Sequence, residues 1–259
     1  AFIAYRAGLL AWTIHRTEPG LRHPVANLLY LVHRLPYPPN KGDKVRSFHL
    51  LKHLAAKHRV FLGTFIDDPE DEAYLDKVSS LCAGVHVARL NPRLAKIKSL
   101  TGLLTGEALT LPYYRDRQLQ TWVDSVFADQ AIDAAVVFSS AMAQYLSKVS
   151  TGKILVDFCD VDSAKWTQYA PNHRWPLSWV YRREGERLLA FEREIAAVAT
   201  HSFLSTENET ALFLRLAPES TGRISTMCNG VDAGFFSPAH DMAPPFGADE
   251  IPLVFTGAM

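Results

Sequence analysis

Short apolar runs alternate along this chain with longer segments whose apolar residues recur every three or four positions. The runs have the length and composition of strands that are covered on both faces of a sheet. They lie at residues 27–33, 59–66, 84–90, 131–140, 153–160, 199–206 and 223–229. After the first run, Val45, Phe48, Leu51 and Leu54 share one face of a predicted helix, with Asp43 as its expected N-cap.

This alternation predicts an α/β fold, a Rossmann-like and mainly parallel sheet with helices on both faces. Right-handed crossovers between parallel strands place the helices on the two faces. In such a sheet, ligands bind beyond the carboxyl ends of the strands. We therefore expect the functional residues in the loops that follow the strands.

Composition narrows the class of protein. The chain has 259 residues, 48% of them apolar, which excludes intrinsic disorder as its main state. Its 27 basic and 27 acidic residues leave no net charge, so we expect no nucleic-acid partner. Cys82, Cys159 and Cys228 are widely spaced and form no CxxC pair, which disfavours a disulfide framework or a zinc ribbon. A reducing, cytoplasmic location fits these features.

The two ends of the chain differ from its middle. Residues 1–25 contain an apolar stretch too short to cross a bilayer and without a cleavage site, so we interpret them as a leader or a misassigned N-terminal segment. The chain begins on Ala1, and its last apolar run enters Gly257. We expect a fragment, in which residues 26–240 form one domain and residues 241–259 form a linker and the first strand of a second domain.

The loop at residues 36–46 offers a site for a phosphate-bearing ligand. Gly42 lets a ligand approach the backbone, and the following helix begins with free N–H groups. Lys41, Lys44 and Arg46 add positive charge at the same place. An ordinary proline-stiffened turn with solvated lysines explains the spacing equally well. The loop matches neither the Walker P-loop nor the GxGxxG pattern of dinucleotide oxidoreductases.

Acidic residues gather where the run at residues 153–160 ends. Asp157, Asp160 and Asp162 lie there together with Lys165. Carboxylates at the end of a buried strand are costly unless they cap a helix or bind a ligand. Asp162 or Ser163 could cap the next helix. Without a nearby histidine or second acidic cluster, we expect no metal.

Residues 89–106 form a predicted basic amphipathic helix. Arg89, Arg93, Lys96 and Lys98 occur there without an acid, while leucine and isoleucine recur at helical spacing. Such a helix can lie on an anionic membrane surface, or it can simply pack on the sheet.

Four segments together resemble a known family. The sequence CNGVDAGFFSP at residues 228–238 is similar to an element that precedes the interdomain linker of family 4 glycosyltransferases with the GT-B fold. PYPPNKGDKVRSFHLLKHLA at residues 36–55 resembles the first loop and helix of that family. Together with DVDSAKWTQYA and FSSAMAQYL, it resembles most closely the bacterial sugar transferases of exosortase-linked exopolysaccharide clusters.

The resemblance covers residues 27–259 and implies the N-terminal, acceptor-side half of a two-domain enzyme. The implied activity is retaining transfer of a sugar from a nucleotide-sugar donor to an acceptor hydroxyl, without a bound metal or other cofactor. The acceptor would be a glycan or a lipid-linked glycan, and the enzyme would be cytoplasmic or peripheral on the inner face of the membrane. We expect this chain alone to have little activity.

The resemblance also implies roles for individual residues. Asp160 lies where many relatives carry the aspartate of a His-Asp pair, although Cys159 occupies the place of the histidine here. Asn229 and Gly230 are interpreted as a structural turn. The residues implied for the donor diphosphate or sugar are Lys41, Gly42, Asp43 and Arg46, and those implied for the acceptor are Ser139, Ser140, Asp162 and Lys165.

Other functions remain open at this stage. A nucleotide-sugar epimerase would bind a similar donor but would need acid and base side chains around the sugar. A non-catalytic module could use the same fold to hold a polysaccharide precursor or a partner enzyme. A dinucleotide-dependent oxidoreductase is disfavoured, because no strand is followed by GxGxxG.

Overall fold

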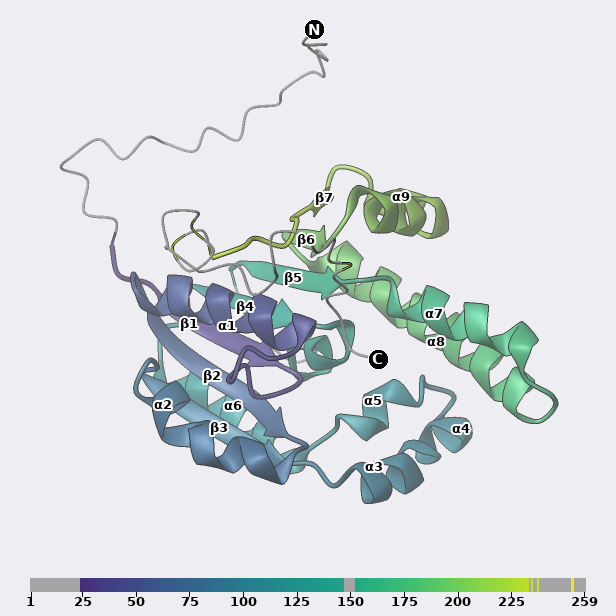
Figure 1. The fold of residues 1–259 in the computed structure, drawn as a ribbon, viewed down its shortest axis with the longest axis horizontal. Coiled ribbons are helices and arrows are strands. Elements are labelled where there is room, and N and C mark those ends of the chain that lie inside the picture. The colour runs from purple at the N-terminus through teal and green to yellow at the C-terminus, as the bar shows by residue number, and fades with distance from the viewer. Residues whose placement is uncertain (1–23, 147–151, 233, 235–236, 238–252, 254–259) are drawn as a thin grey trace, which may run out of the picture.

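A sheet of seven parallel strands, in the order β3-β2-β1-β4-β5-β6-β7, forms the centre of the molecule (Figure 1). The computed structural model describes residues 24–146 and 152–232 together with Gly234, Ser237 and Leu253. The strands are β1 (Asn27–Val32), β2 (Arg59–Ile66), β3 (Gly84–Arg89), β4 (Ala134–Phe138), β5 (Ile154–Cys159), β6 (His201–Leu204) and β7 (Ile224–Thr226). All seven predicted strands are confirmed, each within its predicted range.

Helices connect successive strands. The α-helices are α1 (Gly42–Ala55), α2 (Leu75–Ser79), α3 (Pro92–Ser99), α4 (Thr101–Thr105), α5 (Thr110–Tyr113), α6 (Arg117–Asp129), α7 (Asp162–Tyr169), α8 (Leu177–Val198) and α9 (Glu207–Leu216). Short 3-10 helices lie at η1 (Pro69–Tyr74), η2 (Ser140–Leu146), η3 (Ala170–Asn172) and η4 (Pro218–Ser220). The alternation of apolar runs with helical spacing therefore gave the correct fold class, a Rossmann-like α/β domain.

Alternate residues of each strand point to opposite faces of the sheet, and each face has its own core. On one face, Tyr30 and Val32 of β1 pack with Leu51 of α1 and Val78 of α2. On the other, residues of β1, β4 and β5 pack with α6, α8 and α9. Helices thus cover both faces, as predicted.

The order of the strands reverses between β1 and β4. From β1 the chain winds outward through β2 to β3, and it returns through α6 to β4 and then winds the other way. At such a point the loops after the two central strands separate, and the resulting crevice is where open α/β sheets bind ligands. Here this switch point lies at the paired strand ends Val32 and Phe138.

The helices α7 and α8 form a long antiparallel hairpin that projects away from the sheet (Figure 1). They cross closely at Gly185, where an added Cβ would lie 2.3 Å from Oγ1 of Thr167 and 2.9 Å from the carbonyl oxygen of Ser163. Across the described residues, no helix is both long and apolar enough to traverse a bilayer.

The prediction of one helix over residues 89–106 is wrong. Arg89 is the last residue of β3, and α3 begins at Pro92, where the Asn91 side chain accepts hydrogen bonds from the first turn. A second helix, α4, then ends at Gly106, whose φ of 80° lies in the left-handed region that favours glycine. Asn91 and Pro92 thus set the start of the helical segment and Gly106 sets its end, while α3 and α4 meet at Leu100.

Two glutamates of α8 are buried, although the mixed charges along this helix are typical of an exposed surface. Glu184 accepts hydrogen bonds from Thr110 N and Oγ1 at 2.9 and 2.6 Å, and Glu192 accepts one from Ser163 Oγ at 2.5 Å. Both glutamates are buried. The hydrogen-bond partners of both glutamates therefore lie on other elements, and neither side chain belongs to the solvated face of α8.

Some expectations concern positions outside the described residues. These are the leader at residues 1–23, residues Phe235, Phe236 and Pro238 of the family element, and nearly all of the proposed linker and second-domain strand at residues 241–259.

Candidate functional site

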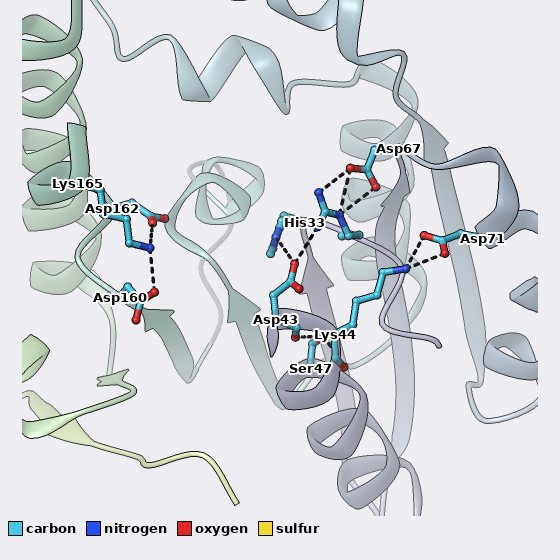
Figure 2. A network of polar contacts seen from close by, with 10 residues as sticks. His33, Asp43, Lys44, Ser47, Asp67, Asp71, Asp160, Asp162 and Lys165 are labelled. Carbon is cyan, nitrogen blue, oxygen red and sulfur yellow. Dashed lines mark hydrogen bonds and ion pairs between the residues drawn. The ribbon is translucent and has the colours of Figure 1, made fainter. Parts of the chain in front are cut away.

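Polar side chains gather at the carboxyl edge of the sheet, on both sides of the switch point between β1 and β4. His33 and Arg34 follow β1, Ser139 follows β4, and Asp160 follows β5. Because β1, β4 and β5 are adjacent and parallel, the segments that follow them emerge at the same edge. Figure 2 shows one cluster around Asp43 and a second around Lys165.

The amino terminus of α1 faces this edge, and the Lys44 N–H of its first turn donates to the Asp43 carboxylate. Lys41 is the N-cap and makes no side-chain capping hydrogen bond, so Asp43 is not the N-cap that the sequence predicted. Gly42 is the first helical residue, and nothing lies within 4 Å of a Cβ added to it. The first-turn N–H groups and the helix dipole together attract anions.

The Asp43 carboxylate points away from the helix axis and joins the end of β1. Its Oδ2 accepts a hydrogen bond from Arg34 Nη1 at 3.1 Å and lies 3.4 Å from His33 Nε2. The hydrogen bond with His33, helped by the charge of Arg34, holds the pKa of Asp43 well below its ordinary value despite partial burial. Arg34 is itself fixed by Asp67, with contacts of 2.7 to 3.1 Å.

His33 was not singled out in the sequence, yet it lies at the centre of the first cluster. Its ring stacks on Phe138 of β4 with centroids 5.8 Å apart and meets the edge of Tyr114 at 5.9 Å. Within the described residues, its buried Nδ1 has no hydrogen-bond partner. Its position directly after the first strand was the available signal, because that place borders the crevice.

The second cluster is built around Lys165 of α7. Its Nζ donates to Asp160 Oδ2 at 2.8 Å and to Asp162 Oδ1 at 3.1 Å, and Ser205 Oγ donates to Asp160 Oδ1 at 3.0 Å. Partial burial opposes the charge of Asp160, but the hydrogen bond from Lys165 prevails and lowers its pKa. Partial burial likewise opposes the charge of Lys165, and its two carboxylate partners raise its pKa above the ordinary value.

Two residues at this edge adopt left-handed backbone conformations that are unfavourable for side chains. Ser139 has φ 75° and Cys159 has φ 66°, at the ends of β4 and β5. Strain of this kind concentrates where function fixes the backbone. Burial raises the pKa of the Cys159 thiol to about 12, so this thiol is protonated near neutral pH and is a poor nucleophile.

Two of the three cations expected in the first loop are internal. Lys44 donates to Asp71 at 2.6 and 2.7 Å, and both side chains are buried. Arg46 donates from Nε and Nη2 to Asp157 at 2.7 and 3.0 Å, and from Nη1 to Asn229 at 2.8 Å. On α1 both residues point inward, so Lys41 is left as the exposed cation of this loop.

The other site residues predicted from the sequence also differ in their exposure to solvent. Ser139 is partly exposed, whereas Ser140 is only 1% exposed and its hydroxyl has no partner in the described part of the chain. The structure thus brings Lys41, Gly42 and Asp43 together, and separately Asp160, Asp162 and Lys165. Arg46 and Ser140 lie behind this edge. In the described ranges, no three His, Cys, Asp or Glu side chains converge to hold a metal ion.

A cavity lies elsewhere, between α1 and the segment after β7. It has a volume of about 750 Å³ and is lined by apolar residues such as Val45, Phe48 and Val231, with Arg46 and Lys52 among its polar residues. It shares Arg46 with the buried pair but contains neither carboxylate cluster.

Fold and site together define the class, a Rossmann-like α/β domain with an anion-attracting helix terminus and ionised carboxylates at its carboxyl edge. The sequence matches no family model and no curated protein. Among solved structures, the chain is similar to the N-terminal domain of trehalose-6-phosphate phosphatase from Candida albicans, with a TM-score of 0.48 and 12% identity over 82% of this chain and 50% of that one.

Two further structures are similar at comparable levels. One is LpCGTa in complex with UDP, with a TM-score of 0.45 and 11% identity over 83% of this chain and 56% of that one. The other is a putative short-chain dehydrogenase/reductase from Sinorhizobium meliloti, with a TM-score of 0.35 and 16% identity over 80% of this chain and 98% of that one. The chain spans about half the length of the first two. With TM-scores below 0.5, these likenesses assign neither a family nor a function.

Proposed function

We propose that this chain is the acceptor-side half of a retaining glycosyltransferase with the GT-B fold, which transfers a sugar from a nucleotide-sugar donor to an acceptor hydroxyl. The observation that carries the proposal is the uncapped amino terminus of α1 at the point where the strand order reverses. The backbone donors and the dipole at a helix amino terminus suit a diphosphate. The segments that resemble family 4 glycosyltransferases include this same loop and helix.

Lys41, Gly42 and Asp43 form the donor side of the proposed site. The first-turn amides and Lys41 bind the diphosphate, and Gly42 allows its close approach because no side chain intervenes. The carboxylate of Asp43 is turned toward His33 and Arg34, and the Arg34 guanidinium balances its charge and limits its repulsion of the phosphates. In this proposal Asp43 accepts a hydrogen bond from a hydroxyl of the transferred sugar.

Asp160 and its neighbours form the acceptor side. Asp160 and Asp162 are half-exposed, and Lys165 forms ion pairs with both and holds them in place. Carboxylates held in this way accept hydrogen bonds from sugar hydroxyls, and Ser139 offers a further polar group at the end of the adjacent strand β4. Asp160 is the proposed catalytic residue because it orients the attacking hydroxyl.

Transfer then occurs on one face of the donor sugar. The bond between the anomeric carbon and the diphosphate oxygen breaks, and the acceptor oxygen bonds to the same face. The acceptor proton passes to the departing diphosphate. The α1 terminus and Lys41 stabilise the charge that develops on that group. Buried Arg46 acts through its pair with Asp157, which positions α1 against β5.

The proposed substrates follow from the resemblance. A nucleoside diphosphate sugar is the donor, and a growing exopolysaccharide or another cell-surface glycan, free or lipid-linked, is the acceptor. The enzyme is proposed to act in the cytoplasm or on the inner face of the membrane.

Donor binding can be tested on the chain itself. In an NMR titration of the labelled chain with UDP-glucose, UDP and pyrophosphate, we expect the largest shifts at the amides of residues 42–45. Lys41→Ala weakens this binding, whereas Lys57→Ala, beyond the other end of α1, leaves it unchanged. Shifts that avoid residues 42–45, or equal affinity of both variants, contradict the donor site.

Catalysis is tested separately on the product of the complete gene. UDP release that depends on an added glycan acceptor measures transfer, and Asp160→Asn should lower kcat by about tenfold or more. Asp129→Asn, an exposed change on α6, is the matched control. An unchanged kcat in Asp160→Asn removes Asp160 from the mechanism.

A further inference from the structure

One end of the molecule exposes an unusual amount of apolar surface. Nine of the fourteen large apolar side chains that are exposed in the described residues lie on α3–α4 or around the turn between α7 and α8. We call these two segments, residues 93–104 and 169–182, the apolar end. Its most exposed members include Leu104 at 90%, Trp175 at 81% and Ile97 at 68%. Isolated exposed apolar residues are ordinary, but a cluster marks an interaction surface.

The two segments belong to one rigid unit. Arg183 of α8 donates to the carbonyl oxygens of Gly102 and Glu107 at 2.7 and 3.1 Å. The neighbouring Glu184 accepts from the N–H groups of Leu109 and Thr110 at 2.5 and 2.9 Å. These bonds fix α4 and the start of α5 to α8, and Figure 1 shows α4 and the α7–α8 turn projecting at the same end of the molecule.

The charges of the apolar end select its partner. No aspartate or glutamate occurs between Asp76 and Glu107 or between Asp162 and Glu184. The exposed cations of the two segments are Arg93, Lys96 and Lys98 on α3 and Arg174 and Arg182 beside the α7–α8 turn. Apolar side chains bordered by cations complement a bilayer that contains anionic lipid, and tryptophan prefers the interface between headgroups and acyl chains.

We propose that the apolar end inserts into the interface of a membrane containing anionic phospholipid, with α3–α4 and the α7–α8 turn as two points of contact. The α7–α8 turn supplies the tryptophans, Trp175 and Trp179, and α3 supplies most of the cations. This attachment does not depend on the chain being a transferase.

The two contact segments begin near the candidate site. The α3 helix follows β3, and α7 begins two residues after Asp160, at the same edge of the sheet. Lys165, which holds Asp160 and Asp162, is a residue of α7. If the proposed function holds, the acceptor carboxylates therefore lie at the base of the hairpin whose turn contacts the membrane, and a lipid-linked acceptor is the favoured substrate class.

Vesicle sedimentation tests the proposal with the 259-residue chain. We expect it to pellet with phosphatidylcholine vesicles that contain phosphatidylglycerol and much less with phosphatidylcholine alone. Three double variants should each weaken binding to the vesicles by about tenfold or more. They are Trp175→Ser/Trp179→Ser, Ile97→Ser/Leu104→Ser and Arg93→Glu/Lys96→Glu. Val198→Ser and Arg215→Glu, exposed changes away from the apolar end, are the matched controls.

A second measurement reports insertion directly. Lipids brominated in their acyl chains quench tryptophans that enter the interface. Quenching should fall strongly in Trp175→Phe/Trp179→Phe, although this variant keeps its apolar rings and still pellets.

Equal pelleting of the variants and their controls would overturn the proposal. Pelleting without vesicles would also overturn it, because it would indicate that the apolar end binds a second copy of the chain. Binding to vesicles without quenching of tryptophan fluorescence would overturn it as well. Because none of these measurements uses a donor sugar, their failure is distinct from failure of the proposed transferase.

Discussion

The guanidinium of Arg46 and the carboxylate of Asp157 meet inside the domain through two hydrogen bonds of 2.7 and 3.0 Å, although 111 residues separate them in the sequence. The pair ties α1 to β5. Burial raises the pKa of Asp157, and the bonded Arg46 opposes this shift. The third nitrogen of Arg46 reaches Asn229, so one side chain connects three segments.

Loss of one member of this pair should be strongly destabilising. Arg46→Met leaves the Asp157 carboxylate buried without its partner, so we expect the free energy of unfolding to fall by about 3–5 kcal/mol. Urea denaturation followed by circular dichroism measures it. Arg46→Met/Asp157→Leu should recover part of the loss, and Lys52→Met, an exposed change on α1, should cost less than about 0.5 kcal/mol. This account is contradicted if the double variant loses as much unfolding free energy as Arg46→Met and Asp157→Leu lose together.

Glu192 makes the stability of the hairpin depend on pH. Burial raises its pKa from 4.5 to about 8. The folded state therefore holds a proton that the unfolded state has released, so this glutamate's contribution to stability is complete below its ordinary pKa and is lost as the pH rises toward 8. Glu192→Gln removes this pH dependence. Between pH 4.5 and about 8, the unfolding free energy of Glu192→Gln minus that of wild type should therefore increase by up to about 1.4 kcal/mol per pH unit.

Denaturation at a series of pH values checks this expectation. Glu186→Gln, an exposed change on the same helix, is the control and should run parallel to wild type. A difference between Glu192→Gln and wild type that stays constant from acid to alkaline pH would show that the Glu192 carboxyl titrates normally.

Gly42→Ala separates stability from ligand binding. Nothing lies within 4 Å of the new methyl group, and alanine restricts the unfolded chain, so thermal stability should stay the same or rise by up to about 1 kcal/mol. The methyl group nevertheless obstructs the approach of a diphosphate to the first-turn amides. For Gly42→Ala we therefore expect calorimetry to show weaker binding of pyrophosphate, together with an unchanged or higher Tm. Unaltered binding of pyrophosphate would show that the anion binds elsewhere.

Ser139 offers a test of backbone strain. Its φ of 75° disfavours any residue with a Cβ, so Ser139→Gly should stabilise the domain by about 1 kcal/mol. Ser139→Val, with a branched side chain, should destabilise it. Thermal denaturation of both variants measures the effect, and the opposite order of Tm values would show that the Ser139 side chain matters more than its backbone.

The sequence predicted the elements better than it predicted the site. In the described part of the chain, apolar runs identified all seven strands, because strands buried on both faces need them. The same pattern could not show that Lys44 and Arg46 point inward, since their partners Asp71 and Asp157 lie 27 and 111 residues away. Charged residues are read as exposed by default, and only tertiary contacts reverse that assignment.

The first cluster was found only in part for a similar reason. Asp43 was expected to cap α1, but the packing of His33 against Phe138 and Tyr114 draws the carboxylate to the end of β1. No local pattern specifies that choice. The second cluster was easier to find, because Asp160, Asp162 and Lys165 lie within one short segment.

The close crossing of α7 and α8 has a consequence for the evolution of this protein. A glycine inside a helix of 22 residues lowers helix stability by about 1 kcal/mol relative to alanine, yet any side chain at Gly185 would meet Thr167 and the backbone of Ser163. Selection for the packed hairpin should therefore retain glycine at this position while exposed residues of α8 drift. In an alignment of homologues, position 185 should then be an invariant glycine, while the exposed positions of α8 vary.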